Sequence, residues 1–309
     1  MRCPWRTGRP PVSVEGLDAR HGAAGLQPSE RAASITVGVV VPTHNSQDTL
    51  EACLASIRAQ TRPCRLVVVD NHSTDSTPQI GRHLADVFLV GGPERSAQRN
   101  AGARVLEADY LGFIDSDMEL APNIVAEVAD LAAAGVDLIV VPEVTVGEGF
   151  WAAVRAFERS FYAGEDQVEA ARFFSRSLFF RVGGFDEALT GAEDWDLARR
   201  ARRAATVGRT RSGIQHLEGK ISFRHACTKK AYYAEGVWAY RRKHGCLAVL
   251  AAGNRKYVRE PWRLVWPHPI LGAGLIALKS GEMIAAAWTL VRLRSVGSRA
   301  GQPKGPTGL

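Results

Sequence analysis

Short runs of β-branched apolar residues alternate with stretches of helical spacing, and this alternation constrains the fold more than any other feature. Ser34–Pro42 is long enough for a buried parallel strand. Residues 50–57 then carry apolar side chains at helical spacing, and Arg65–Asp70 is a second apolar run. A strand, a helix and a strand at this distance form a βαβ unit with a right-handed crossover. Further strands are expected at residues 87–90, 110–114 and 136–141, with helices at 94–106 and 124–131. The pattern predicts an α/β fold with a doubly wound sheet.

Two acids, Asp115 and Asp117, end the apolar run that begins at Tyr110. Open α/β sheets bind ligands at the carboxyl ends of their strands, so both carboxylates are expected at the ligand edge. Carboxylate oxygens suit hard divalent ions, which proteins often hold together with substrate phosphates. The pair therefore indicates a metal–diphosphate site. An ordinary turn is the alternative, because Asp and Ser also build turns.

The chain of 309 residues is basic overall. Its length suits one large domain or one domain with an appendage. The chain has 39 Lys and Arg against 32 Asp and Glu, a net charge of +7 that suits anionic lipid, nucleic acid or a phosphorylated substrate. No nucleic-acid-binding signature accompanies the basic residues, so no nucleic-acid partner is expected. The five cysteines are scattered and include no CxxC pair. This favours a reducing, cytoplasmic setting over a disulfide framework or a zinc site.

The two ends of the chain differ in composition from residues 34–245, which are expected to form the main domain. Residues 1–33 are rich in proline and glycine and have no sustained apolar stretch, which predicts a disordered tail without a secretory signal. Residues 246–309 contain an apolar segment from Trp262 to Leu293, divided by Pro267, Pro269, Gly272, Gly274 and the polar residues near Lys279. Two short helices are predicted, with no uninterrupted span long enough to cross a bilayer. Flanking basic residues suit attachment to the anionic inner face of the cell membrane, and a packed subdomain or dimer face is the alternative.

Five blocks of sequence, taken in order, resemble the signatures of the family 2 glycosyltransferases, which have the GT-A fold. They are residues 39–45, 67–77, 95–102, 113–117 and 183–197. The resemblance extends from about Ile35 to Gly245. It implies a GT-A fold with a mixed, doubly wound sheet and a small helical C-terminal appendage. The implied reaction moves a sugar from a nucleotide-diphosphate donor to a hydroxyl acceptor, in cell-surface glycan or glycolipid synthesis. The acceptor would be a glycan or a lipid-linked group.

The resemblance also implies which residues contact the nucleotide. Pro42, Thr43 and Asn45 belong to the end of the first strand and the turn after it, and they would lie on the nucleotide. Strand termination and helix capping are the alternative, which for Asn45 explains the residue about equally well. Asp70 would read the base or the ribose. Family members often have Asp-Asp-Gly-Ser where this chain has Asp-Asn-His-Ser at 70–73, which leaves the details of base recognition open.

Four further residues would handle the diphosphate and its cation, Mg²⁺ or Mn²⁺. Arg99 would grip the phosphate oxygens, with a solvated helix face as the alternative. Asp117 would be the principal metal ligand, and Asp115 would reach the metal, its bound water or the ribose. His216 would supply a further ligand, unless it is a structural histidine or His225 takes that part.

The acidic motif at residues 193–197 implies the catalytic base. Asp194 would take the proton of the acceptor hydroxyl and Glu193 would bind the acceptor or orient the loop, with inversion at the anomeric carbon. Favourable charge at a helix N-terminus is the alternative for these acids, and for Asp196 it is the preferred one. Two other functions are a non-catalytic nucleotide-sugar-binding protein and a nucleotidyltransferase. The latter would normally have a glycine-rich basic loop after the first strand, where this chain has Pro-Thr-His-Asn.

Overall fold

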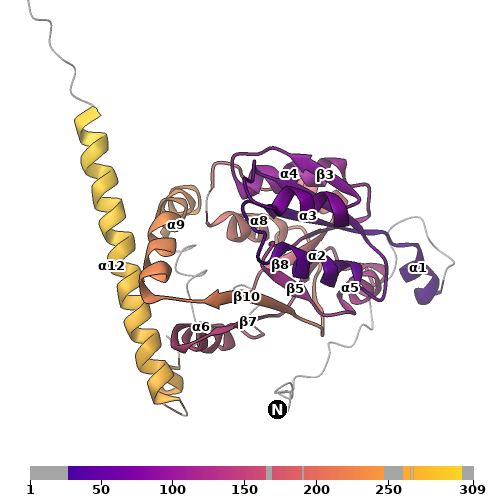
Figure 1. The fold of residues 1–309 in the computed structure, drawn as a ribbon. Coiled ribbons are helices and arrows are strands. Elements are labelled where there is room, and N and C mark those ends of the chain that lie inside the picture. Colours follow the sequence, from indigo (N-terminus) through magenta and orange to yellow (C-terminus); the bar gives the residue numbers. More distant parts are fainter. Residues whose placement is uncertain are drawn as a thin grey trace, which may run out of the picture.

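A seven-stranded mixed sheet forms the centre of the molecule (Figure 1). The computed structural model describes residues 27–164, 169–189, 191–246, 260–264, 266 and 268–300. In sheet order the strands are β3 (Val87–Val90), β2 (Arg65–Asp70), β1 (Val37–Thr43), β4 (Tyr110–Phe113), β8 (Ala171–Ser175), β6 (Leu138–Val140) and β9 (Val207–Arg209). Strands β3, β2, β1 and β4 are parallel, and β8 runs antiparallel to both of its neighbours.

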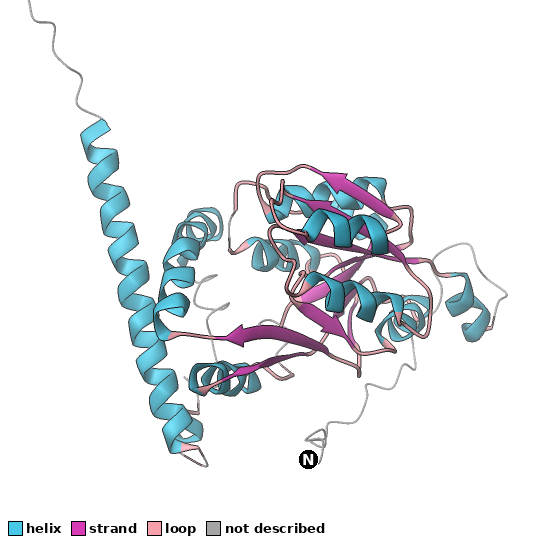
Figure 2. Ribbon diagram, in the orientation of Figure 1, coloured by secondary structure: helices cyan, strands magenta, loops and turns pink. Residues whose placement is uncertain are grey.

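Helices cover both faces of this sheet (Figure 2), because the side chains of its buried strands alternate between two cores. Val39 and Val41 point into one core, whereas Val40 points into the other. The first core is covered by α2 (Leu50–Arg58), α3 (Thr77–Leu84) and α5 (Ile124–Ala133). The second is covered by α4 (Arg95–Val105), α7 (Arg176–Arg181) and α8 (Glu193–Ala201). The predicted α/β architecture with a mixed, doubly wound sheet is confirmed.

A second, three-stranded sheet was not predicted. Its order is β5 (Met118–Leu120), β10 (Ile214–Lys220) and β7 (Glu143–Glu148). Strand β10 contains the polar sequence Gln-His-Leu-Glu-Gly-Lys and is buried only in part, so it lacks the apolar run that marks a central strand. Its pairing with β5 sets His216 opposite Met118, one residue from Asp117.

A layer of three helices stands at one side of the sheets: α6 (Phe150–Ser160), α9 (Phe223–His244) and the long α12 (Pro269–Ala300) (Figure 1). Helix α12 packs on both α6 and α9, and a 3₁₀ turn, η1 (Pro261–Leu264), precedes it. The prediction of two short helices was therefore wrong. Gly274 and Gly281 do not end the helix, since they are the points where it approaches α6 and α9, and a Cβ there would overlap Phe150 and Phe223.

The ends of the chain differ from prediction in two further ways. Residues 28–33 of the predicted disordered tail belong to helix α1 (Pro28–Ser34), and residues 1–26 of that tail lie outside the described residues. Among the described helices, Pro269–Thr289 of α12 is long and apolar enough to cross a membrane, contrary to the prediction, although a core helix can pass the same test. The boundary between main domain and appendage at residue 245 stays a prediction.

Candidate active site

The predicted site residues gather where the carboxyl ends of β2, β1 and β4 meet. Thr43 pairs with Asp70 at the ends of β1 and β2, and β4 lies on the other side of β1. Asp115 lies two residues after the end of β4, and Asp117 comes just before β5. The parallel strands thus bring side chains from distant parts of the sequence to one edge, as the sequence predicted.

Arg99, on the buried face of α4, is the central group of the site. Its side chain is 0% exposed. Its Nη2 donates to Asp115 Oδ1 at 2.5 Å, and its Nη1 lies 3.1 Å from Asp194 Oδ1 and 3.5 Å from Glu193 Oε1. One guanidinium therefore joins the acid at the end of β4 to the two acids that open α8. The prediction that Arg99 grips the diphosphate conflicts with these contacts, because its charge is already balanced by protein carboxylates.

A second chain of contacts runs from Asp115 through two buried groups that the sequence had not singled out for the site. Arg172 Nη1 lies 3.4 Å from Asp115 Oδ2, and Arg172 Nε donates to Glu143 Oε1 at 2.6 Å. Glu143 Oε2 accepts from Arg159 Nη1 at 2.5 Å. The one available sequence signal was a charged residue at a strand position among apolar neighbours, as at Arg172 between Ala171 and Phe173. The sequence does not reveal which strands and helices lie side by side, so it could not show that Arg172, Glu143 and Arg159 contact one another.

The same chain ends at Asp117, through His216. Arg159 Nη2 lies 3.2 Å from His216 Nδ1, and His216 Nε2 lies 3.1 Å from Asp117 Oδ2. A guanidinium has only donors, so Nδ1 of His216 must accept and Nε2 must carry the hydrogen that Asp117 accepts. We call the whole set the site network: the carboxylates of Asp115, Asp117, Glu143, Glu193 and Asp194, the arginines Arg99, Arg159 and Arg172, and His216.

Burial and neighbouring charges shift the pKa values of two acids of the network, Asp115 and Glu193, in opposite directions. Burial raises the pKa of Asp115, but the guanidinium groups of Arg99 and Arg172 outweigh it and hold that pKa well below its usual range. Burial, and next the negative charge of Asp194, raise the pKa of Glu193 above its usual range in spite of Arg95 and Arg99. Glu193 Oε2 is buried and has no hydrogen-bond partner. Arg99 thus contacts one acid whose pKa is lowered and one whose pKa is raised.

The predicted nucleotide residues hold the loops after β1 and β2 together. Asp70 is 1% exposed and accepts from the backbone N–H of Ser73 at 2.9 Å and from its hydroxyl at 2.5 Å. Asn45 has a φ of 48° and accepts from the backbone N–H of Thr74 at 2.9 Å. Thr43 is buried next to Pro42, and its Oγ1 has no hydrogen-bond partner. These contacts fix the shape of the loops after β1 and β2.

Of the three predicted metal ligands, Asp117 suits a cation, whereas Asp115 and His216 do not. Asp117 is 36% exposed at its side chain and contacts only His216 among the site residues. Both oxygens of Asp115 are taken by arginines, and Nε2 of His216 offers a hydrogen where a metal ligand needs a lone pair. No group of three or more His, Cys, Asp or Glu within the described ranges is arranged to hold a metal. The donor set therefore suits a hard cation held by Asp117 and by oxygens of a bound phosphate.

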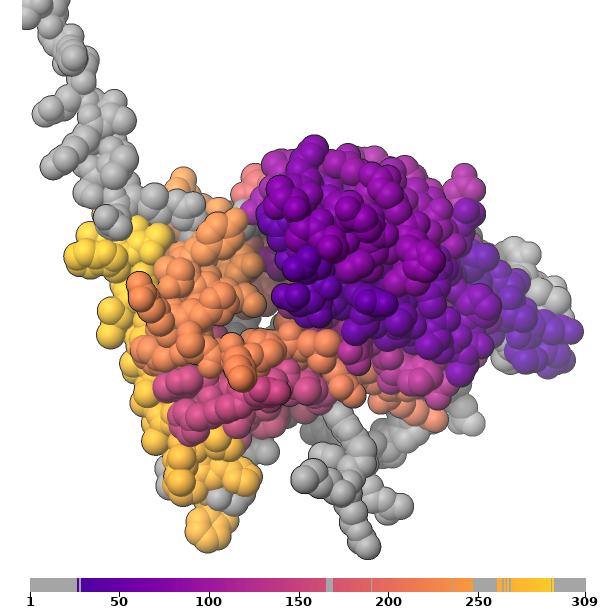
Figure 3. Space-filling view, in the orientation of Figure 1, coloured from indigo at the N-terminus to yellow at the C-terminus, as the bar shows by residue number. Residues whose placement is uncertain are grey.

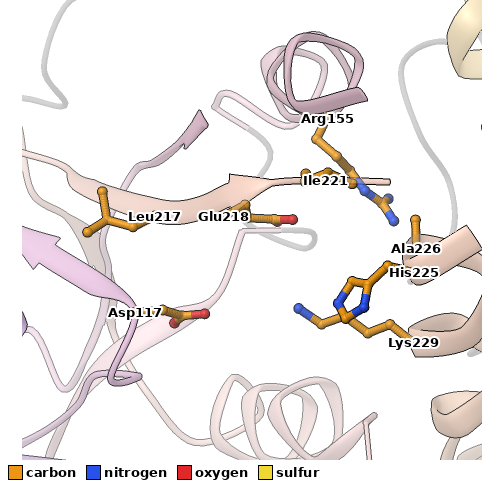
Figure 4. A pocket seen from close by; sticks show the side chains of 8 residues that line it. All are labelled: Asp117, Arg155, Leu217, Glu218, Ile221, His225, Ala226 and Lys229. Carbon is orange, nitrogen blue, oxygen red and sulfur yellow. The ribbon is translucent and has the colours of Figure 1, made fainter. Parts of the chain in front are cut away.

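A cavity of about 200 Å³ opens beside Asp117 (Figure 4). Its other walls come from β10, α6 and α9, and His225 and Lys229 face Asp117 across it. Asp194 does not line this cavity, and its link to the strand-end acids runs through Arg99. His225, the rival metal ligand, thus lies on the far wall from the carboxylate.

Asp196 has a structural role, as preferred from the sequence. Helix α8 begins at Glu193, which sets Glu193, Asp194 and Asp196 in its first turn. Asp196 is 0% exposed and binds Arg200 at 2.5 Å, His244 at 2.6 Å and Lys243 at 2.9 Å. It therefore fastens α8 to α9 and is not available to a substrate.

Comparison with known proteins agrees with this geometry. Residues 38–185 match the model described as glycosyl transferase family 2. This part of the chain belongs to glycosyl transferase family 2. The succinoglycan biosynthesis protein ExoA of Rhizobium meliloti is 30% identical over 201 residues, which cover 57% of this chain and 61% of that protein. The pre-mycofactocin glycosyltransferase of Mycobacterium tuberculosis is 29% identical over 284 residues, covering 81% and 57%. The chain thus spans less than two thirds of either relative.

A solved structure confirms the GT-A fold of this family 2 domain. The mannosyltransferase PcManGT from Pyrobaculum calidifontis, in complex with GDP-Man and Mn²⁺, aligns with a TM-score of 0.52 at 20% identity, over 88% of this chain and 81% of that one. At this identity the likeness concerns the fold alone. The family match ends at residue 185, so the acids of α8 lie beyond it.

Proposed function

We propose that the protein is an inverting glycosyltransferase that moves a sugar from a nucleotide-diphosphate donor to a hydroxyl acceptor. The observation that carries the proposal is the guanidinium of Arg99, which joins Asp115 after β4 to Asp194 in the first turn of α8. This contact holds the donor-side acid and the proposed base in one rigid arrangement. A protein that only binds nucleotide sugars has no need of Asp194 in that position.

The donor is proposed to lie along the carboxyl edge of β2, β1 and β4. Its nucleoside would meet Thr43, Asn45 and Asp70, and its diphosphate would lie near Asp117. A Mg²⁺ or Mn²⁺ ion held by Asp117 would neutralise charge on the leaving diphosphate as the sugar–oxygen bond breaks. His216 would orient the Asp117 carboxylate through its Nε2–H and is not itself a ligand in this proposal.

Asp194 is proposed as the general base. Its side chain is 37% exposed, which leaves it within reach of an acceptor. As the acceptor oxygen attacks the anomeric carbon, its proton passes to Asp194, the new carbon–oxygen bond forms, and the bond to the diphosphate breaks with its electron pair. Attack from the face opposite the leaving group inverts the anomeric carbon. Glu193, which pairs with Arg95 and Arg99, would bind the acceptor or orient the loop.

The acceptor is proposed to be a hydroxyl of a cell-surface glycan or of a glycolipid. Support comes from the name of one relative, which concerns succinoglycan biosynthesis. The GDP-Man and Mn²⁺ bound to PcManGT support the donor class and a divalent ion.

Two substitutions test the assignment of roles. Asp194→Asn should retain donor binding in the presence of Mn²⁺, measured by calorimetry, and lose about 10²- to 10⁴-fold in transfer rate, because it lacks the base. Asp117→Ala should weaken donor binding itself. Asp130→Asn, an exposed acid on α5, is the matched control and should change neither quantity.

The outcomes separate the alternatives. Transfer at the wild-type rate by Asp194→Asn would refute the base. Donor binding without any transfer by the wild-type protein, over a panel of hydroxyl acceptors, would favour the non-catalytic nucleotide-sugar binder. Release of inorganic diphosphate from a nucleoside triphosphate and a sugar phosphate would identify the nucleotidyltransferase instead.

A further inference from the structure

The outward side of α12 is an apolar face that nothing in the described parts of the chain covers. Its large side chains are between 56% and 73% exposed: Ile270, Ile276, Met283, Ile284, Trp288 and Val291. They recur at helical spacing, and the other exposed positions between them are alanines and Ser280. At ~1.5 Å per residue this face is about 30 Å long. We call these six side chains the outer face of α12. Space-filling Figure 3 shows α12 at the edge of the molecule, next to α9.

The inward side of the same helix carries buried charges. Lys279 binds Glu158 of α6 at 2.6 Å and Glu282 at 2.8 Å. Arg155 of α6 binds Glu158 at 2.9 Å and also binds Glu282. Glu282 is 2% exposed and Glu158 is 4% exposed. A helix crossing a bilayer would have to break these pairs and carry a lysine and a glutamate into the hydrocarbon core, which is costly. The helix therefore stays on the protein and offers only its outer face.

Aromatic and charged residues indicate what covers this face. Trp262 and Trp266, both exposed, precede α12, and Trp288 lies on its outer face. Tryptophan is enriched where membrane meets water. In the sequence, basic residues lie at both ends of the apolar segment, with Arg259 and Arg263 at its start and Arg292, Arg294 and Arg299 at its end. From Pro261 to Leu309 the one acid is Glu282, which is buried against Arg155.

The charge pattern favours an anionic surface over a second copy of the chain. A two-fold dimer through this face would set identical segments against each other. Because both ends of the segment are basic, parallel and antiparallel packing would each bring like charges together. Anionic lipid headgroups complement these charges, and acyl chains accept the apolar side chains.

We infer that α12 is an interfacial anchor that lies in the plane of an anionic lipid bilayer and inserts its outer face without crossing the membrane. Helices α6 and α9 then stand between the membrane and the site network, with the cavity beside Asp117 walled by both of them. This inference is independent of the reaction proposed above.

Vesicle sedimentation tests the anchor with the full chain. Vesicles of phosphatidylcholine and phosphatidylglycerol should carry the wild-type protein into the pellet at physiological salt, and vesicles of phosphatidylcholine alone should carry much less. The double variant Ile284→Gln, Trp288→Gln should bind the anionic vesicles at least about tenfold more weakly, because two apolar side chains no longer leave water. Val105→Gln, at an exposed apolar position on α4, is the matched control and should bind as the wild type does.

Three further readouts decide among the alternatives. The double variant should unfold at the wild-type temperature, since both side chains are exposed, so that lost binding does not reflect misfolding. Wild-type protein that stays in the supernatant, or a double variant that binds equally, would overturn the inference. So would a wild-type dimer in light scattering that the double variant converts to a monomer, since the face would then join two copies. Protein that leaves the vesicles only in detergent, and not at alkaline pH, would indicate a spanning helix and overturn the inference as well.

Discussion

Arg99 holds three carboxylates around one buried guanidinium, and this determines what each acid can do. Its five donors lie in a fixed plane, which suits simultaneous contact with Asp115 on one side and with Glu193 and Asp194 on the other. Its Cζ also lies 5.1 Å from the centre of the Phe185 ring, which limits its movement. The residue positions the proposed base, Asp194, and the strand-end acid, Asp115.

Arg99→Lys should lower the free energy of unfolding by about 3 kcal/mol, because a single ammonium cannot serve acids on both sides and leaves buried charge unpaired. Urea unfolding at neutral pH measures this change. Arg104→Lys, at an exposed position on the same helix, is the control and should change the free energy of unfolding by less than about 0.5 kcal/mol. Equal stability of the two variants would contradict the positioning role of Arg99.

His216→Gln distinguishes an orienting histidine from a metal ligand. Glutamine keeps an N–H that can donate to Asp117, so we expect donor affinity in the presence of Mn²⁺ to fall by about tenfold at most. Asp117→Asn should cost more than His216→Gln in the same calorimetric titration. A larger loss for His216→Gln than for Asp117→Asn would make His216 the principal ligand.

At the scale of elements, buried ion pairs decide how α12 sits on α6. Glu158 accepts from Arg155 and Tyr162 within α6 and its following turn and also binds Lys279 of α12. Burial raises the pKa of Glu158, but Lys279 and Arg155 together bring it from 4.5 to about 2. A pKa lowered by folding adds stability that is present above the unfolded value and is lost as the pH falls toward the folded value.

Glu158→Gln should therefore lower the free energy of unfolding by about 3 kcal/mol at pH 7 and by clearly less at pH 3. Urea unfolding at the two pH values gives both differences. Glu148→Gln, on the exposed end of β7, provides the control and should show no such pH dependence. If the difference between the wild type and Glu158→Gln is the same at both pH values, the ion pairs do not hold the two helices together.

At the scale of the molecule, two sheets and a helical layer bring together the walls of one site. Strands β1, β2 and β4 supply the edge proposed to bind the donor, β10 supplies His216, and α8 supplies Glu193 and Asp194. If Asp117 holds the cation together with the donor phosphates, as proposed above, donor and cation should bind as a unit.

A nucleotide-diphosphate sugar of the correct kind should raise the unfolding temperature when Mn²⁺ is present, since a ligand at about 100 times its Kd adds about 2.7 kcal/mol to the folded state. A chelator should abolish that rise, yet leave the unfolding temperature unchanged when no donor is present. Thermal unfolding under the four conditions measures both effects. A donor-induced rise that persists with the chelator would show that binding does not depend on a metal.

Much of the central sheet could be predicted from the sequence, because its signals are local. The apolar runs at β1, β2 and β4 specify buried strands, and parallel pairing then fixes which edge carries Asp70, Asp115 and Asp117. The strand β10 of the second sheet was not predicted, because its sequence is too polar to show the local pattern of a strand.

The sequence by itself determined the α/β class, the family and the edge at which the acids meet. Only the tertiary structure decided three further features. They are the partners of Arg99, the contact of His216 with the guanidinium of Arg159, and the continuity of α12 through its glycines. The physical reason is the range of the interactions. Hydrophobic periodicity acts over a few residues and is visible in the chain, whereas the charge that balances Arg99 comes from Asp194, 95 residues away, and becomes its neighbour only once the sheet has formed.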